Sequence, residues 1–425
     1  MPSTAPASAH QRIARLATLT AVHRAFHWLH LHQPQLRLWQ MEMLTIPAPP
    51  FGEAARADWF LDRFRALDLA NVHLDGAGNA LAELRPSTSP TSPCILLSAH
   101  LDTVFPASLF SDTNPCLPTE DGARILCPGA CDNAAGLTAL LAIAAALRYA
   151  DIAPPVPILF AANVGEEGEG DLRGMRQIFL RGAYRDRIAA AIALEGSGSA
   201  AVVTRALASR RFRITVTGPG GHSWTDSDRP NPILLLSRAI AKFAEIELPN
   251  NPRTTISVGQ ISGGTSINSI PEVATALIDL RSTDSDQLRR TETEMRKILS
   301  ELTPEGSQSK SINIDVQIIG DRPGGALAND SSLLHTIHAV DRHLTLHTEQ
   351  RMGSTDANLP ISLGVPAIAI GAGGTGGGIH TLREWYDPTG RETALRRVLL
   401  VLLDTVQQAS EAMPHNTSAV DTLQS

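Results

Sequence analysis

The sequence predicts an α/β protein, in which a domain built on a mostly parallel sheet flanked by helices carries a smaller α+β domain as an insert. A chain of 425 residues is too long for one ordinary hydrophobic core. Short apolar segments alternate with helical segments up to residue 207, which is typical of βα units. From residue 208 the strands alternate apolar and polar side chains instead. We therefore expect a first domain in two segments, residues 1–207 and 326–425, around an insert of residues 208–325.

The N-terminal region is expected to be helical. Residues 11–40 repeat apolar side chains at three- and four-residue steps, and Glu53 to Leu67 predicts a further helix. Asn71 to Glu83 is expected to form a hairpin with Asp75-Gly76 as turn material. Arginines but no acidic residues precede Glu42, a composition also found in organellar transit peptides. We favour an N-terminal helix over a targeting segment and expect no secretory signal.

Apolar runs that end in polar side chains mark the expected site. Cys94 to Ser98, Pro157 to Ala162 and Ala189 to Leu194 predict buried strands, and Asp132 opens an Ala/Leu-rich helix. In open α/β sheets, ligands bind beyond the carboxyl ends of the strands. The groups that follow the strands or lie in matching loops are His100, Asp102, Asp132, Glu166, Glu167, Glu195 and His380. These side chains are therefore expected to converge.

Two histidines with three carboxylates suit a pair of Zn²⁺ ions, because imidazole and carboxylate oxygen are ordinary zinc ligands. A bridging carboxylate would hold two such ions roughly 3.5–4 Å apart. Water between the ions becomes acidic, and a neighbouring carboxylate can accept its proton. The adjacent Glu166 and Glu167 suit this division, one for metal and one for water. The pattern predicts hydrolysis of a carbonyl compound.

The insert has the element order strand-helix-strand-strand-helix-strand, which predicts a ferredoxin-like α+β domain. Its strands are expected at residues 211–217, 255–261, 273–280 and 312–318, and its helices at residues 232–246 and 285–302.

As an ordered set, the motifs resemble those of the dizinc metallopeptidase family that includes aminoacylase, glutamate carboxypeptidase, peptidase T and succinyl-diaminopimelate desuccinylase. The resemblance covers nearly the whole chain. The motifs that carry it are Ser98-Ala-His-Leu-Asp-Thr103, Gly129-Ala-Cys-Asp-Asn-Ala-Ala-Gly136, Gly165-Glu-Glu-Gly168, Leu194-Glu-Gly196, Gly220-Gly-His-Ser223, Asn268-Ser-Ile-Pro271 and Gly353-Ser-Thr-Asp-Ala357.

The resemblance implies roles for the strand-end residues. It places His100 and Glu195 on one zinc ion, Glu167 and His380 on the other, and Asp132 between the two. Co²⁺ or Mn²⁺ are alternatives to Zn²⁺.

The remaining two strand-end residues would serve catalysis. By the same resemblance, Glu166 would be general base and acid, and Asp102 would orient His100.

The resemblance also gives the insert a role as lid and dimerisation surface, so that we expect a homodimer. His222 would support the oxyanion, and Asn268 and Arg281 would hold the substrate, a small peptide or an N-acyl amino acid. An arginine fork pairs well with a substrate carboxylate.

Two features conflict over which end of a peptide is recognised. Glu195 resembles carboxypeptidases and deacylases, whereas residues 210–216 and the Gly-His-Ser-Trp224 segment resemble peptidase T, an aminopeptidase. The choice stays open on the sequence.

Composition excludes several classes of protein. A formal charge of −7 argues against nucleic-acid binding. The longest apolar segment, Ala134 to Leu147, is too short to span a membrane. The four cysteines, Cys94, Cys116, Cys127 and Cys131, fit no disulfide framework, which favours reduced thiols in a cytoplasmic protein.

Two rival interpretations belong to other functional classes. One is a peptide-binding relative that keeps its metal without catalysis. The other is a dehydrogenase, suggested by the glycine run Gly371 to Gly378. A dinucleotide loop should open a helix, but His380 and Trp385 follow this run. We expect instead that its glycines let backbone amides approach a substrate carboxylate.

Overall fold

The computed structural model describes residues 8–85, 92–111, 114–115, 117–302 and 311–413. The chain divides into two compact units. The main unit comprises Met1–Thr204, Leu327–Arg351 and Thr355–Ser425, and the inserted unit comprises Arg205–Ala326 with Met352–Ser354.

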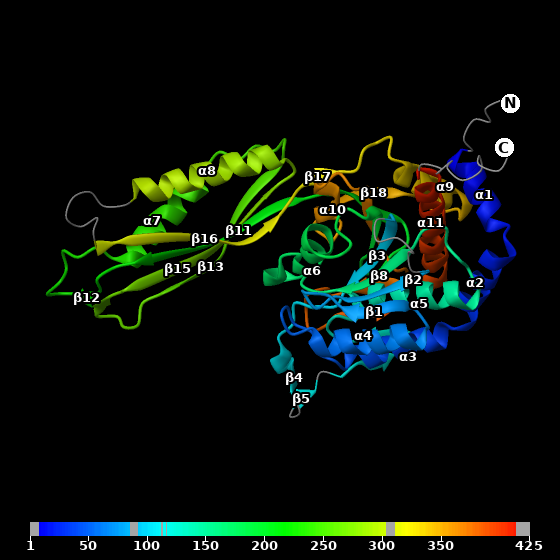
Figure 1. Cartoon of the computed structure of the whole chain (residues 1–425). Helices are drawn as coiled ribbons and strands as arrows, with labels where there is room; N and C mark the ends of the chain where they lie inside the picture. The colour runs from blue at the N-terminus through cyan, green and yellow to red at the C-terminus, as the bar shows by residue number, and fades with distance from the viewer. Residues whose placement is uncertain (1–7, 86–91, 112–113, 116, 303–310, 414–425) are drawn as a thin grey trace, which may run out of the picture. The chain divides into compact units, whose positions relative to one another are not determined.

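A mixed, mainly parallel sheet forms the centre of the main unit (Figure 1). In order across the sheet, the strands that belong to the main unit are β1 (Ala70–Leu74), β2 (Ala80–Leu84), β8 (Ile158–Asn163), β3 (Cys94–His100), β9 (Ile188–Leu194), β19 (Ala367–Ile370) and β10 (Ala201–Ala206). Strand β3 lies parallel to both β8 and β9, and β9 lies parallel to β19. The first hairpin, β1–β2, and β10 add antiparallel edges, and β18 (Glu349–Gly353) also pairs with β10. The predicted fold class is confirmed.

The helices of the main unit are α1 (Ala9–Ala17), α2 (Thr20–Leu31), α3 (Gln33–Leu44), α4 (Ala54–Ala66), α5 (Ala134–Tyr149), α6 (Arg173–Arg176), α9 (Ser332–His343), α10 (Asn358–Ser362) and α11 (Arg391–Glu411). The predicted N-terminal helical region is divided into three by Thr18 and His32. Pro34 lies in the first turn of α3, where its missing N–H costs nothing. In the described part of the chain, no helix has the length and apolar character needed to cross a membrane.

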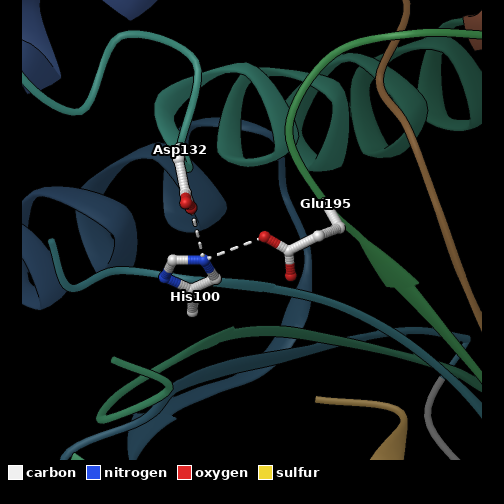
Figure 2. A group of neighbouring side chains, drawn as sticks. All are labelled: His100, Asp132 and Glu195. Carbon is white, nitrogen blue, oxygen red and sulfur yellow. Dashed lines mark hydrogen bonds and ion pairs between the residues drawn. The ribbon is translucent and has the colours of Figure 1, made fainter. Parts of the chain in front are cut away.

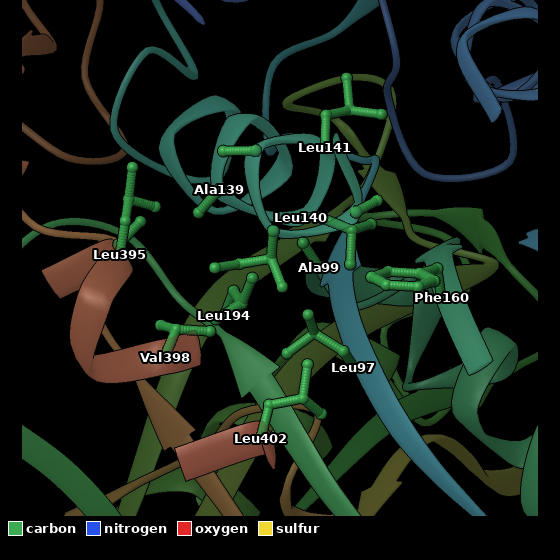
Figure 3. Close-up of a cluster of buried hydrophobic side chains, with 14 of the residues drawn as sticks. Leu97, Ala99, Ala139, Leu140, Leu141, Phe160, Leu194, Leu395, Val398 and Leu402 are labelled. Carbon is green, nitrogen blue, oxygen red and sulfur yellow. The ribbon is translucent and has the colours of Figure 1, made fainter. Parts of the chain in front are cut away.

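The core is built where β3 meets α5 and α11. Every residue of β3 is buried, as expected for a central strand covered on both faces. Leu97 and Ala99 of β3 lie among Leu140 of α5 and Val398 and Leu402 of α11 (Figure 3). His100 therefore lies at the carboxyl end of a fully buried strand.

The N-terminal helix is joined to the end of the chain. Helix α1 packs against α9 and α11 (Figure 1). Arg12 of α1 donates to the buried carboxylate of Asp404 at 2.8 Å (Nε to Oδ1) and 3.0 Å (Nη2 to Oδ2).

The main unit also contains short strands outside its central sheet. A second sheet has the order β20 (Thr375–Gly377), β21 (Trp385–Asp387), β7 (Arg124–Leu126) and β6 (Thr119–Asp121), and β4 (Phe110–Ser111) pairs with β5 (Asn114–Pro115). Short turns of other helix types are η1 (Ala107–Leu109), η2 (Gly168–Gly170) and η3 (Gln177–Arg181). The second sheet joins the segment after β19 to the chain just before Asp132. Local patterns in the sequence do not predict this pairing.

The inserted unit is an antiparallel sheet with two helices. Its elements are β11 (Ala208–Thr217), β12 (Gly221–His222), α7 (Pro232–Ala244), β13 (Thr254–Gly263), β14 (Ser269–Ile270), β15 (Val273–Ser282), α8 (Ser285–Glu301), β16 (Asn313–Arg322) and β17 (Gly325–Ala326). The main strands lie in the order β13-β15-β11-β16. Alternate residues of β15 are buried under α7 and α8, which explains the apolar–polar alternation of the sequence. The predicted order of elements in this region is confirmed.

Candidate metal centre

His100 lies at the carboxyl end of β3 and is fully buried. Its Nδ1 lies 3.0 Å from the backbone oxygen of Asp102, so the ring donates from Nδ1 and turns Nε2 toward two carboxylates. Nε2 lies 3.1 Å from Asp132 Oδ1 and 3.3 Å from Glu195 Oε1 (Figure 2). The three side chains come from β3, the loop before α5 and the end of β9.

His380 meets the opposite face of Asp132. Its Nε2 lies 3.1 Å from Asp132 Oδ2 and 2.9 Å from Glu167 Oε1. Asp132 therefore presents one carboxylate oxygen to each histidine. The sequence had placed His380 and His100 at the ends of separate strands, and the fold brings both to one aspartate.

The arrangement contains two groups of possible metal ligands that share Asp132. His100, Asp132 and Glu195 form one group, and Asp132, Glu167 and His380 form the other, with ligand atoms within 4.8 Å of one another in each. Among the residues that the structure describes, no hydrogen-bond donor reaches the buried Glu195 Oε2. Imidazole nitrogen with carboxylate oxygen is a normal donor set for Zn²⁺ and similar divalent ions. The residues fit a pair of metal ions.

The electrostatics favour cations. Burial disfavours a charged His100, but Glu195, Asp102 and Asp132 outweigh burial and hold its pKa well above the usual value. Hydrogen bonds to Asp132 and Glu167 raise the pKa of His380 to about 10. Burial raises the pKa of Glu195 to about 7. The carboxylates outnumber the imidazoles, so binding of divalent cations would displace protons and relieve the excess negative charge.

Asp102 connects His100 to the loop that carries the two glutamates. Its buried carboxylate accepts the backbone N–H of Glu166 at 3.0 Å and of Glu167 at 2.7 Å. Asp102 Oδ1 lies 3.6 Å from His100 Nδ1, farther than the backbone oxygen of Asp102. The Asp102 carboxylate was expected to orient His100, but the nearer acceptor for His100 Nδ1 is the backbone oxygen of Asp102.

The tight loop Gly165–Gly168 places Glu166 and Glu167. Gly165 has φ +68°, and a Cβ there would lie 2.5 Å from Cγ of Arg173. Arg173 in turn pairs with the buried Glu53 and donates to the backbone oxygen of Ala77 at 2.6 Å. Glu166 and Glu167 are both buried. Because glycine has no Cβ, Gly165 lets the side chain of Arg173 pack directly against this loop.

Two buried charged residues near the site were missed. Arg56 donates to the backbone oxygen of Leu101 at 2.8 Å and to that of Ile46 at 3.1 Å. Glu384 accepts backbone N–H groups from the loop that carries Asp132. The sequence offered one signal for each residue. Arg56 lies on the apolar face of a predicted helix, and Glu384 follows His380 by four positions.

The glycine run after β19 is close-packed against protein. A Cβ on Gly376, in β20, would lie 2.4 Å from the Sγ of Cys131, and a Cβ on Gly371 would lie 2.4 Å from the backbone oxygen of Ser197. The run continues into β20, which pairs with β21, and opens no helix. The structure thus disfavours a dinucleotide loop. Protein packing accounts for glycine at positions 371 and 376. The approach of a substrate carboxylate to the backbone amides of the run stays a prediction.

In the inserted unit, two of the three expected substrate residues are neighbours. His222 in β12 pairs with Ser269 of β14, and Ser223 donates its N–H to the backbone oxygen of Asn268 at 3.0 Å. Both side chains are exposed. Arg281 lies at the far end of β15, opposite Ser209, and its Nε donates to Asp279 at 2.7 Å. Within this unit Arg281 is separated from the other two by the length of the sheet.

The curated relatives that the chain matches include proteins named probable carboxypeptidases. A protein named probable carboxypeptidase from Emericella nidulans is 27% identical over 218 residues, which cover 46% of this chain and 50% of that protein. The chain thus spans about half the length of the curated relatives it matches.

Two solved structures share the fold. A tripeptidase from Staphylococcus aureus has a TM-score of 0.69 at 21% identity, over 88% of this chain and 98% of that one. A Bacillus subtilis protein described as a dinuclear metal binding peptidase has a TM-score of 0.61 at 14% identity, with coverages of 88% and 98%. The model of peptidase family M20/M25/M40 matches residues 96–408. The chain belongs to this peptidase family.

Proposed function

We propose that this chain is a two-metal hydrolase that cleaves the amide bond of a small peptide or an N-acyl amino acid. The observation that carries the proposal is Asp132, whose two oxygens each lie 3.1 Å from a different histidine. Zn²⁺ is the proposed metal, with Co²⁺ or Mn²⁺ as alternatives. Two divalent ions in these groups would polarise the substrate carbonyl and acidify a water molecule.

Glu166 is proposed as the general base and acid. It belongs to neither group of metal ligands, yet it adjoins Glu167, which belongs to one. Its backbone N–H donates to the Asp102 carboxylate, which fixes the position from which the Glu166 side chain extends. Glu166 would take the proton of the attacking water and deliver it to the leaving amine.

His222 is suited to support an oxyanion. Its Nδ1 accepts the backbone N–H of Trp224 at 3.1 Å, which leaves the proton of a neutral ring on Nε2. A side chain with an available N–H donor can stabilise charge on a substrate oxygen. Asn268 beside it is proposed to hold the substrate, and Arg281 is proposed to pair with a substrate carboxylate. A homodimer through the inserted unit is also proposed.

A cytoplasmic location is the last part of the proposal. Cys94, Cys127 and Cys131 are buried free thiols. Cys116 lies outside the described residues. Thiols that remain reduced suit a reducing compartment.

The test is hydrolysis by zinc-loaded protein of two matched peptide panels, each with and without a chelator. One panel has blocked amino ends and free carboxylates, and the other has free amino ends. Chelator-sensitive cleavage of the blocked panel would identify a carboxypeptidase or deacylase, whereas cleavage of the other panel would identify an aminopeptidase. Metal binding without cleavage of either panel would contradict the proposal and favour a peptide-binding protein.

A further inference from the structure

Glu384 makes contacts that its position in the sequence does not suggest. Its side chain is buried, with 1% of its surface exposed. Oε1 accepts the backbone N–H groups of Cys131 at 2.9 Å and Asp132 at 2.8 Å, and Oε2 accepts that of Gly129 at 2.8 Å. One carboxylate thus accepts three backbone N–H groups from the loop that carries the shared aspartate.

These hydrogen bonds make the loop and the carboxylate depend on each other. A buried carboxylate is costly unless hydrogen bonds replace its water, and buried N–H groups are costly without an acceptor. In the observed loop conformation the three N–H groups converge on this carboxylate. A loop that opened would leave both the carboxylate of Glu384 and the N–H of Asp132 unsatisfied.

The same short segment also holds His380. Glu384 N donates to Thr381 O at 3.1 Å, and Thr381 N donates to Gly378 O at 3.0 Å, so that His380 lies within a compact turn. The backbone oxygen of Glu384 accepts the N–H of Cys127 at 3.1 Å. The next residue, Trp385, pairs with Leu126 in the β21–β7 ladder.

We infer that Glu384 is a positioning residue that sets the Asp132 carboxylate between the two histidines and thereby controls divalent-metal affinity at both groups. The inference deepens the proposed function and rests on its metal site. Because Asp132 is shared, loosening its loop should weaken both groups. Residues that hold metal ligands in place typically change affinity by about 10- to 100-fold when replaced.

The experiment measures Zn²⁺ binding to the full chain by competition with a chromophoric chelator, well below the melting temperature of each variant. Glu384→Ala removes all three hydrogen bonds, and we expect its dissociation constants for Zn²⁺ to rise about 10- to 100-fold. Glu384→Gln keeps one carbonyl oxygen, and we expect a smaller rise. If the alanine variant does not fold, the glutamine variant alone decides.

Glu83→Gln is the matched control. Glu83 is also buried in the main unit, and it accepts a hydrogen bond from the hydroxyl of Tyr184 at 2.6 Å. The control should keep the zinc affinity of the parent, even if it melts at a lower temperature. Zinc affinity within twofold of the parent in both folded Glu384 variants would overturn the inference.

The result is separable from the test of function, because zinc affinity is measured without substrate. A parent that binds zinc but cleaves neither peptide panel contradicts the proposed hydrolase, and weaker binding by the Glu384 variants would still support their positioning role. A parent that cleaves peptides, together with variants of unchanged zinc affinity, would contradict the role of Glu384 alone.

Discussion

Asp102 Oδ2 accepts the backbone N–H of Glu167 at 2.7 Å, across 65 positions of sequence. The same carboxylate accepts the N–H of Glu166 through its other oxygen. One buried aspartate, two residues after His100, therefore holds the loop that carries both the proposed base and a proposed ligand. Its role extends beyond the histidine that the sequence suggested.

Asp102→Asn should lower turnover, because an amide replaces one acceptor with a donor that faces a backbone N–H. We expect a loss of about 10- to 100-fold, measured as kcat on the cleaved panel. Asp75→Asn is the matched control, since Asp75 accepts the backbone N–H groups of Ala77 and Asn79 in the β1–β2 turn. Equal turnover in parent and Asp102→Asn would contradict the role of Asp102.

Glu166→Gln should abolish most turnover while the protein keeps its metal. The change preserves shape and removes the proton acceptor, which is worth about 10²- to 10⁴-fold in rate. Metal content by elemental analysis should match the parent, because Glu166 belongs to neither ligand group. The control is Glu169→Gln, at an exposed glutamate of the next turn. A variant as active as the parent would refute Glu166 as the base.

His222→Ala should lower turnover without loss of metal. Removal of one oxyanion donor costs about 10²- to 10³-fold in kcat. His347→Ala, which alters an exposed histidine of the main unit, should behave as the parent. Steady-state kinetics with metal analysis makes the comparison. If His222→Ala keeps parental kcat, the proposed oxyanion role is wrong.

The buried ion pair between Arg397 and Asp341 should be essential to stability. Arg397 Nε and Nη2 lie 2.6 Å and 2.7 Å from the two carboxylate oxygens, and the side chains are 0% and 1% exposed. Arg397→Met leaves a buried carboxylate unpaired, so we expect a loss of about 3–5 kcal/mol in the free energy of unfolding.

Urea denaturation measures this loss. Arg65→Met is the control, because Arg65 forms a solvent-exposed ion pair with Asp62. Such pairs contribute about 0–1 kcal/mol to the free energy of unfolding. Similar stability losses in the two variants would show that burial does not strengthen the Arg397 pair.

Glu292 in α8 should make stability depend on pH. Burial raises the pKa of Glu292, but hydrogen bonds from Arg210 and Arg296 outweigh burial and bring this pKa below its usual value. A lowered folded-state pKa contributes stability above the unfolded-state pKa, and this contribution disappears as pH falls through the folded-state pKa. Glu292→Gln should therefore melt below the parent at pH 7, with the difference shrinking in more acidic buffer.

Thermal melts of both proteins across acidic and neutral buffers check this prediction. The exposed Glu294 of the same helix provides the control variant Glu294→Gln, whose melting temperature should track that of the parent. A gap between parent and Glu292→Gln that widens toward low pH would contradict the sign of the effect.

Local patterns in the sequence were enough to predict most elements and the order of the fold. The buried run of β3 and the apolar–polar alternation of β15 follow directly from side-chain periodicity, because strands covered on two faces differ from strands covered on one. Helix α4 and the β1–β2 hairpin lie within a few residues of their expected bounds. The candidate ligands were recognisable because each polar group follows a strand or opens a helix.

The sequence by itself determined the family, the strand-end placement of the candidate ligands and the inserted α+β unit. Only the tertiary structure decided that Asp132 faces both His100 and His380 and that Glu384 holds its loop. The contacts of His380 and Glu384 with the Asp132 loop join residues about 250 positions apart. Periodicity reports which face of an element is buried, but a hydrogen bond to a distant backbone group depends on the path of the whole chain.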